Sequence, residues 1–243
     1  MATDNRIAVV TGANKGIGRA IVEQLAVAGV TVFLGSRDRA RGQAAVDELT
    51  SSGLDVRLLE LDITDDASVA AAVKSFTEQA DRLDALVNNA GAAFGWSTAP
   101  SAEPLDQIKA IYDVNVFGTI RVTQAFIPLL KVAPSANVVM MSSLAGSLTA
   151  GSDRTSPFYR VNQLGYNSSK TALNGVVVAF AKELSASGVK VNAVEPGFVG
   201  TEMNAGRGPL TPAQGAVEAV RLALAGTDGP SGGFFGADGS HPW

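Results

Sequence analysis

A short apolar segment, a glycine-rich stretch and a helix-like segment follow one another near the start of the chain, and their order most constrains the fold. Residues 7–10 are apolar, residues 11–18 read Thr-Gly-Ala-Asn-Lys-Gly-Ile-Gly, and apolar residues recur at helical spacing through residue 28. A glycine turn between a strand and a helix presents backbone N–H groups and the positive end of the helix dipole to a phosphate. Glycine-rich turns also occur where nothing binds. This stretch therefore indicates a nucleotide-binding site only if further motifs of such a site follow it in the sequence.

The rest of the chain alternates strand-like and helix-like segments. We expect seven strands, at residues 7–10, 30–34, 56–61, 83–87, 137–141, 190–194 and 233–236. No linker interrupts the 243 residues, which predicts one α/β domain over residues 1–243 with a doubly wound, mostly parallel, seven-stranded sheet flanked by helices. The longest helix is expected at residues 106–130. Loops that contact substrate are expected at about 92–104, 147–165 and 197–212, the last resembling a lid.

Composition excludes several classes of function. The net charge of −4 argues against nucleic acid or an acidic membrane surface as a partner. The chain has no cysteine, and its one histidine is His241, so it offers neither a Ser-His-Asp triad nor a metal site built from cysteines or several histidines. No metal site is predicted. The sequence shows neither a signal peptide nor an apolar run long enough for a membrane span, and we expect a cytoplasmic protein.

The end of the second predicted strand bears on which nicotinamide cofactor would fit. A site that prefers NAD usually places an acid there to bind the ribose hydroxyls. Here Ser36 and Arg37 come first and Lys15 lies in the glycine stretch, which favours the extra 2′-phosphate of NADP. The alternative is that Arg37 is a solvated loop residue and Asp38 binds the ribose.

Polar residues also follow the third, fourth and fifth predicted strands. Asp62 either accepts a hydrogen bond from an adenine amino group or begins the next helix. Asn88 and Asn89 are expected to join neighbouring strands, and Asn115, among apolar positions of the long helix, is either a structural bridge or part of the site. Ser142 and Ser143 end the fifth strand, where open α/β sheets bind ligands.

Tyr166 and Lys170 stand four residues apart at the start of a predicted helix, which places them on one face. Tyrosine ordinarily has a pKa of about 10 and is a weak acid near neutrality. A neighbouring ammonium, together with the positive charge of an oxidised nicotinamide, stabilises the phenolate and is expected to lower that pKa.

Taken together, these motifs resemble the classical short-chain dehydrogenase/reductase family and, within it, the NADPH-dependent carbonyl reductases. The matching pieces span nearly the whole chain in the family's order. They are the glycine stretch with Gly12, Gly16, Ile17 and Gly18, then Asp62, Asn88-Asn89-Ala90-Gly91, Asn115, Ser143, Tyr166-X-X-X-Lys170 and Pro196-Gly197. The resemblance implies a Rossmann fold and NADPH/NADP+ as the cofactor.

The resemblance also implies a role for each matching residue. Tyr166 donates the proton in carbonyl reduction, Lys170 lowers its pKa and bonds the nicotinamide ribose, Ser143 holds the carbonyl oxygen, and Asn115 supports a water-mediated proton path through Lys170. Ser143 is preferred to Ser142 because the family serine commonly stands three residues before a glycine, here Gly146. Cofactor contacts are implied for Gly12, Asn14, Lys15, Gly16, Ile17, Gly18, Ser36, Arg37, Asp62, Ile63, Asn89, Ala90, Gly91, Tyr166, Lys170, Pro196, Gly197, Val199 and Thr201.

The substrate and the assembly state are less constrained. Five residues of the predicted loops suggest an apolar pocket for a small carbonyl or alcohol substrate: Phe94, Trp96, Phe158, Phe198 and Met203. Tyr166 lies 23 residues after Ser143, more than in many classical members. The carbonyl reductases also carry extra sequence there, which covers the helix surface that other members use to form tetramers. We therefore expect a monomer or a dimer.

Three functions are open at this point. The leading one is NADPH-dependent reduction of a ketone or aldehyde. The second is an NAD-dependent alcohol or hydroxysteroid dehydrogenase working in the opposite direction. The third is a non-catalytic NADP sensor, which is disfavoured because such proteins typically lose the tyrosine or the lysine that this chain retains.

Overall fold

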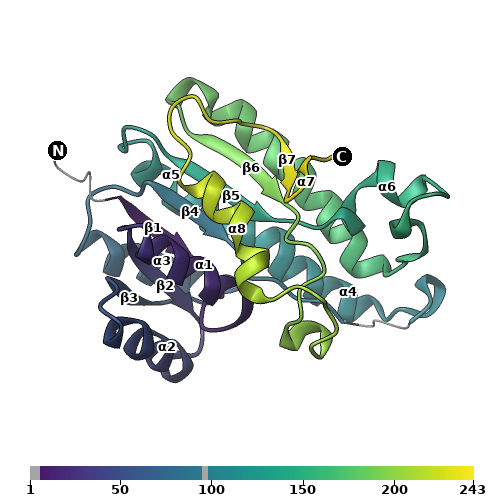
Figure 1. Cartoon of the computed structure of the whole chain (residues 1–243), viewed down its shortest axis with the longest axis horizontal. Helices are drawn as coiled ribbons and strands as arrows, with labels where there is room; N and C mark the ends of the chain where they lie inside the picture. Colours follow the sequence, from purple (N-terminus) through teal and green to yellow (C-terminus); the bar gives the residue numbers. More distant parts are fainter. Residues whose placement is uncertain (1–5, 95–97) are drawn as a thin grey trace.

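Eight strands form one sheet in the part of the chain that the structure describes, residues 6–94 and 98–243 of a computed structural model (Figure 1). The sheet order is β3-β2-β1-β4-β5-β6-β7-β8, and every neighbouring pair is parallel except β7 with β8. The strands are β1 (Ile7–Val10), β2 (Thr31–Ser36), β3 (Val56–Glu60), β4 (Ala85–Asn88), β5 (Asn137–Met141), β6 (Lys190–Val194), β7 (Phe234–Gly236) and β8 (Gly239–Ser240). The doubly wound sheet is confirmed, but the expected count of seven is wrong because two-residue β8 is too short to show a strand period.

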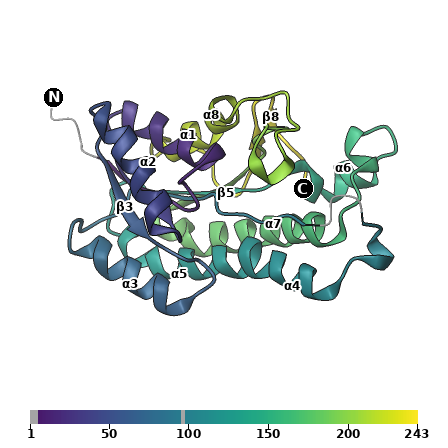
Figure 2. The same cartoon turned by 90° about the horizontal axis from the view of Figure 1, so that it is seen from below.

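Helices cover both faces of the sheet, as the edge-on view shows (Figure 2). One face carries α1 (Gly16–Val27), α2 (Arg39–Ser51) and α8 (Pro212–Ala223). The opposite face carries α3 (Asp66–Thr77), α4 (Leu105–Tyr112), α5 (Thr119–Leu130) and α7 (Leu164–Leu184). The short α6 (Leu148–Ser152) projects at one end of the molecule.

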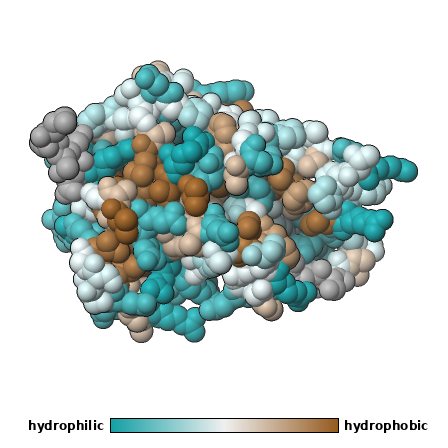
Figure 3. Space-filling view, in the orientation of Figure 1, coloured by the Kyte–Doolittle hydropathy of each residue, from teal (hydrophilic) through white to brown (hydrophobic). Residues whose placement is uncertain are grey.

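The central strands are apolar along their length because both of their faces are covered. In β1, Ala8 and Val10 belong to the core under α1 and α8, whereas Val9 belongs to the core under α3, α5 and α7. In that second core, Phe76 packs between Phe33 and Phe126, with ring centroids 4.7 and 5.5 Å apart. Val27 and Val217 are 71% and 56% exposed. On the face drawn in Figure 3, apolar side chains form several patches separated by polar ones.

The helix expected over residues 106–130 is interrupted. Between α4 and α5 the chain forms a wider, π-helical segment, η2 (Asp113–Gly118). This turn buries Asn115, whose side chain bonds Ala92 and Ser169. The apolar residues keep nearly helical spacing through the segment, so the sequence pattern does not reveal the extra residue per turn.

The segment 147–165 is wrongly predicted as an irregular loop. It contains α6 and a 3-10 turn, η4 (Pro157–Arg160), after the 3-10 turn η3 (Leu144–Gly146). Ser147 caps α6 by accepting from Ala150 N, and Ser156 caps η4 by accepting from Phe158 N. Elements of four or five residues are too short for a hydrophobic period, so their serine caps are the available signal. Within the described ranges, no helix combines the length and the apolar character needed to cross a bilayer.

Candidate active site

The glycine stretch lies at the carboxyl end of β1, beside β4, where the order of the strands reverses. Gly12 and Gly16 adopt φ values of +61° and +57°, which favour glycine. A Cβ on Gly12 would lie 2.8 Å from Ala90 Cα, and one on Gly18 would lie 2.4 Å from Asn89 Nδ2. Lys15, the N-cap of α1, makes no side-chain capping bond. The first residues of α1, Gly16, Ile17 and Gly18, line the cleft, so the start of this helix is available to a phosphate.

Hydrogen bonds from β4 fix the shape of the glycine stretch. Asn89 Nδ2 donates to the carbonyls of Thr11 and Gly12 at 2.9 and 3.1 Å. Thr11 Oγ1 accepts from the backbone N–H groups of Asn89 and Ala90, both at 3.0 Å. The expectation that an asparagine joins neighbouring strands holds for Asn89, because these bonds tie β4 to the segment after β1.

One cleft of about 550 Å³ runs past this stretch at the carboxyl ends of the strands. Most of the residues predicted to contact a cofactor or to catalyse line it: Gly12, Asn14, Lys15, Gly16, Ile17, Gly18, Arg37, Asp62, Ile63, Asn89, Ala90, Gly91, Tyr166, Lys170, Pro196 and Thr201. Ser36, Asn115, Ser143, Gly197 and Val199 are outside this lining, which includes Ser142 in place of the predicted Ser143. The prediction did not name several lining residues, including Leu61, Thr64, Val114, Met141 and Glu202.

Exposed charges mark one end of the cleft, which we call the Arg37 end: Lys15, Arg37 and Asp62. Lys15 forms an ion pair with Glu202 across the cleft, and Arg37 is exposed. Partial burial acts to raise the pKa of Asp62, but hydrogen bonds from Thr64 and the charges of Arg37 and Arg121 outweigh it and lower the pKa. Asp62 does not cap α3, because that cap is Asp65, which accepts from Ala67 N.

Two residues expected at the Arg37 end serve the backbone instead. The Ser36 side chain is buried and donates to the Asp38 carbonyl at 2.8 Å. It therefore points away from the cleft, contrary to the predicted phosphate contact. Asp38 accepts from Arg41 N at 3.0 Å and so caps α2. The other Asp38 oxygen lies 3.4 Å from Arg41 Nε, so both oxygens of this acid have partners on Arg41.

The opposite end, which we call the Tyr166 end, buries two charged groups, Lys170 and Glu195, beside the half-buried Tyr166. Lys170 Nζ donates to the Met141 carbonyl at 2.7 Å and lies 5.7 Å from the centre of the Tyr166 ring. A Cβ on Gly91 would lie 3.5 Å from Asn115 Oδ1 and 3.8 Å from Lys170 Nζ, so these groups converge. Asn115 in turn accepts from Ala92 N at 2.8 Å.

Burial shifts the acidity of both groups on α7. It raises the pKa of Tyr166 to about 12, with the charge of Glu195 adding to the rise and a hydrogen bond with Ser143 opposing it. Burial lowers the pKa of Lys170 to about 8, against the opposing charge of Glu195. In the protein alone, therefore, the Tyr166 pKa moves up rather than down as expected, because burial dominates.

The two adjacent serines after β5 have different partners. Ser142 is buried and donates to Asn174 Oδ1 at 2.5 Å. Ser143 Oγ accepts from Ala145 N at 3.2 Å, and the Ser143 side chain acts to lower the pKa values of Tyr166 and Glu195. Ser143 is therefore the serine within reach of Tyr166. No motif in the sequence singles out Glu195, which directly follows β6.

The predicted substrate residues do not gather as a group. Phe94 and Met203 line the cleft and are 46% and 42% exposed. Phe158, in η4, and Phe198, 57% exposed, are outside its lining. Trp96 lies outside the described residues. Val199, predicted to contact the cofactor, is buried, and a Cβ on Gly215 would lie 2.5 Å from it.

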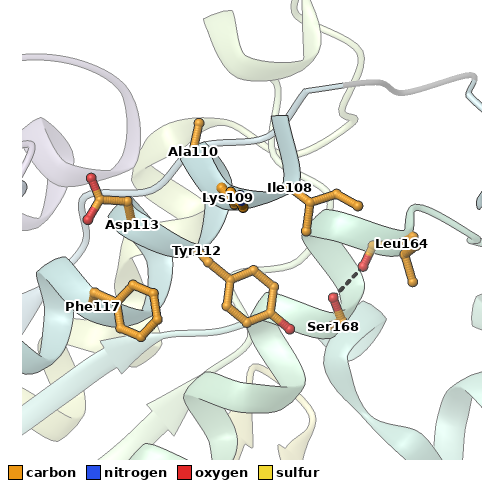
Figure 4. A pocket seen from close by; sticks show the side chains of 8 residues that line it. All are labelled: Ile108, Lys109, Ala110, Tyr112, Asp113, Phe117, Leu164 and Ser168. Carbon is orange, nitrogen blue, oxygen red and sulfur yellow. Dashed lines mark hydrogen bonds between the residues drawn. The ribbon is translucent and has the colours of Figure 1, made fainter. Parts of the chain in front are cut away.

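A second hollow, a groove of about 730 Å³, lies between α4 and the start of α7 (Figure 4). Its lining shares no residue with the cleft and includes Tyr112, Phe117 and Leu164. None of residues 147–163 lines this groove. Instead, α6 bonds the C-terminal segment through Thr149 N and the Trp243 carbonyl. The expectation of a monomer or a dimer stays a prediction.

Comparison with known proteins agrees with this arrangement. The model of the family described as short chain dehydrogenase matches residues 6–209. The chain belongs to the short-chain dehydrogenase family. Among curated relatives of this short-chain dehydrogenase, salutaridine reductase of Papaver bracteatum is 32% identical over 96% of this chain and 94% of its own. The (+)-neomenthol dehydrogenase of Arabidopsis thaliana is 34% identical over 95% of each chain.

Solved structures support the same conclusion for this short-chain dehydrogenase. An NADPH-bound carbonyl reductase from chicken fatty liver superposes with a TM-score of 0.85, at 28% identity, over 98% of this chain and 99% of the other. Salutaridine reductase from Papaver somniferum gives a TM-score of 0.82 at 31% identity over 96% and 100%. The protein is therefore an oxidoreductase of the classical branch, with reductases among its relatives.

Proposed function

We propose that this protein reduces a ketone or an aldehyde to an alcohol with NADPH, using Tyr166 as the proton donor. One observation carries the proposal: Tyr166 and Lys170 line the same cleft as the glycine stretch, with Lys170 Nζ 5.7 Å from the centre of the Tyr166 ring. A phenol, a hydroxyl and an ammonium beside a phosphate-binding turn suit reduction of a carbonyl next to a nicotinamide.

The cleft has suitable groups for each part of the cofactor. The glycine stretch and the N-terminus of α1 would hold the pyrophosphate, because backbone N–H groups and the helix dipole favour an anion there. Gly12 and Gly18 keep this turn against β4, since a side chain at either position would clash with neighbouring atoms. Arg37 and Lys15 would meet the 2′-phosphate, and Asp62 the adenine amino group. Thr201 would bond the nicotinamide amide. Bound NADPH supplies the hydride.

The protein's own groups would manage the proton and the developing charge. Ser143 donates a hydrogen bond to the carbonyl oxygen, and Tyr166 gives that oxygen its proton as the hydride arrives at carbon. The Lys170 ammonium stabilises the phenolate and bonds the nicotinamide ribose. Asn115 accepts from Ala92 N, and Gly91 lies next to both Asn115 and Lys170. Asn115 would support a proton path through Lys170 to water. Phe94 and Met203 provide apolar contacts for a small substrate.

The test is a panel of ketones and aldehydes, with loss of NADPH absorbance as the signal. Turnover of at least one carbonyl is expected, and Tyr166→Phe should reduce the rate about 10²- to 10⁴-fold because the proton donor is lost. NADPH binding, followed by its fluorescence, should be unchanged in the variant. A Tyr166→Phe protein as active as the wild type would contradict the assignment.

Two other functions remain as outcomes of the same panel. An NAD-dependent alcohol or hydroxysteroid dehydrogenase would prefer NADH and NAD+. The position of Asp38 argues against it, because one oxygen of that acid caps α2. A non-catalytic NADP sensor would bind NADPH and reduce nothing, with Tyr166→Phe indistinguishable from the wild type.

A further inference from the structure

Glu103 is a buried carboxylate that the mechanism above does not use. It lies between the 3-10 turn η1 (Pro100–Ala102) and α4, and it is 9% exposed although both of its chain neighbours are exposed. Leu105, two residues later, is 64% exposed. This segment therefore turns an acid inward and a leucine outward, the reverse of the usual arrangement. A buried acid is costly unless a hydrogen bond offsets the loss of water.

The partner of Glu103 is the backbone of α7, which packs beside α4 (Figure 2). Glu103 Oε1 accepts from Gly165 N at 3.1 Å, and this bond is itself buried. The other oxygen, Oε2, is buried and has no hydrogen-bond partner among the residues that the structure describes. Within those residues, the bond to Gly165 is the one that offsets the burial of this acid.

This bond does the work of a helix cap. The residue before α7, Gln163, is the N-cap by position but makes no side-chain capping bond. A cap accepts from the second or third N–H group of a helix, because these groups have no partner inside the helix. Gly165 is the second residue of α7, so Glu103 supplies the cap from another part of the chain. A carboxylate also suits the positive end of the helix dipole.

The glycine at position 165 lets the carboxylate approach the helix. A Cβ on Gly165 would lie 2.5 Å from Glu103 Oε1 and 3.0 Å from Ile111 Cδ1. Any side chain at this position would therefore push the carboxylate away. Glycine is a poor helix former, so the close approach of Glu103 explains a residue that helix propensity disfavours here.

The capped turn carries the phenol, since Tyr166 directly follows Gly165. The next turn of α7 is held by a different contact, the bond from Lys170 Nζ to the Met141 carbonyl at the end of β5. The phenol and the ammonium are thus fixed by separate bonds, one to the segment before α4 and one to the sheet.

We propose that Glu103 is a positioning residue for Tyr166: its carboxylate caps the first turn of α7 and thereby holds the phenol at the reacting carbonyl. The inference rests on the proposed function, since it concerns the proton donor. It also joins the loop at about 92–104, which is expected to contact substrate, to the helix that carries Tyr166.

The first test compares Glu103→Met with Glu103→Gln in carbonyl reduction. Methionine has a similar length but no acceptor for Gly165 N, so the first turn of α7 should loosen. We expect kcat to fall about 10- to 100-fold, because a displacement of about 1 Å can cost 10²-fold in rate. KM for NADPH should stay close to the wild-type value, because Lys170 and the glycine stretch keep their contacts.

Glutamine keeps the acceptor oxygen, so Glu103→Gln should restore kcat close to the wild-type value. A Glu103→Met protein with the wild-type kcat would overturn the proposal. So would a Glu103→Gln protein as slow as Glu103→Met, because the capping bond would then not be the cause.

A matched variant separates this effect from the loss of any buried carboxylate. Asp84 is 4% exposed, accepts from Ile7 N at 2.8 Å at the amino end of the strands, and lies outside the cleft lining. Asp84→Leu should lose stability and keep the wild-type kcat. An equal fall of kcat in Asp84→Leu and Glu103→Met would mean that lost stability alone slows the enzyme, and the proposal would be wrong.

Gly165→Ala tests the same bond without changing the acid, and it carries the test if Glu103→Met does not fold. Alanine is the better helix former, but its Cβ would displace the Glu103 carboxylate. We therefore expect kcat to fall as in Glu103→Met. The wild-type kcat in Gly165→Ala would contradict the proposal.

A further measurement needs no turnover and so survives failure of the proposed function. In a Tyr112→Phe/Tyr159→Phe background, Tyr166 is the one tyrosine left, and phenolate absorbance after rapid mixing with alkaline buffer reports its titration. Burial raises the pKa of Tyr166 to about 12. Adding Glu103→Met should lower the titration point by about one pH unit as water reaches the phenol, whereas Glu103→Gln should leave it in place. Equal titration points in the two variants would overturn the proposal.

Discussion

The two ends of the cleft handle charge in opposite ways. At the Arg37 end, the Lys15 and Glu202 side chains are 49% and 73% exposed. At the Tyr166 end, Lys170 is 5% exposed and Glu195 8%. Exposed charges are screened by salt and contribute little per pair, whereas buried charges shift one another's pKa values. Substitutions at the Arg37 end should therefore change which cofactor binds, and substitutions at the Tyr166 end should change the chemistry.

The largest expected effect would come from Lys170→Met. The variant keeps a long side chain but loses the charge beside the phenol. We expect carbonyl reduction to slow about 10²-fold or more. Steady-state rates at saturating NADPH measure this effect. If the variant reduced carbonyls at a rate within a few-fold of the wild type, the proposed difference between the two ends of the cleft would be wrong.

The same variant also tests the burial of the charge through stability. Folding lowers the Lys170 pKa to about 8, whereas unfolded lysine titrates at about 10.4. Between these two pH values the unfolded chain binds more protons than the folded one, so the free energy of unfolding increases as pH rises. Below about pH 8 both states carry the charged lysine, and the cost of burying that charge lowers the stability of the folded protein in full. Urea unfolding should show that Lys170→Met increases the free energy of unfolding most below pH 8. The difference between the variant and the wild type should shrink toward pH 10. A difference that is constant with pH would contradict this.

A smaller effect is expected from Arg37→Ala. Losing an exposed cation that faces the 2′-phosphate should lower the preference for NADPH over NADH about tenfold and leave kcat nearly unchanged. The ratio of kcat/KM values for the two cofactors is the measurement. Arg39→Ala is the matched control, because Arg39 is exposed, pairs with Glu60 and lies outside the cleft lining. Equal ratios in the wild type and Arg37→Ala would remove the argument for NADP.

The smallest effect is expected from Glu202→Gln. The change frees Lys15 from its exposed ion pair, so NADPH should bind about two- to fivefold more tightly at low salt, with little change for NADH. Fluorescence titration of each cofactor tests this, with Glu60→Gln as the control. A loss of affinity would instead mean that Glu202 helps to hold the cofactor.

Much of the fold follows from the sequence because its signals are local. The strand–glycine–helix unit, the parallel strands and the placement of Tyr166 and Lys170 on one helix each depend on spacing within a few residues. The π-helical turn around Asn115 and the strand β8 were missed because an apolar period does not report one extra residue or a two-residue strand. Segment 147–165 has no apolar period, because α6 and η4 are too short to show one. The serines that cap these two elements are the signal for them in the sequence.

The candidate site was predicted less completely, for physical reasons that lie in tertiary contacts. Ser36 looks like a phosphate ligand from its position, but its side chain turns back to the Asp38 carbonyl. Glu195 looks like a strand end, yet it bonds Leu144, which is 51 residues away along the chain. The rise in the Tyr166 pKa likewise depends on burial, which spacing does not give.

The last residues of the chain pack against β7 and against the segment that follows Ser143. The Trp243 ring stacks on Phe234 with centroids 5.6 Å apart, and Ser147 donates to the Pro242 carbonyl at 2.9 Å. A purification tag or a fluorescent fusion at this end would disturb these contacts with β7 and with the start of α6. Anyone who immobilises the enzyme or builds a sensor from it should therefore leave this C-terminal segment unmodified.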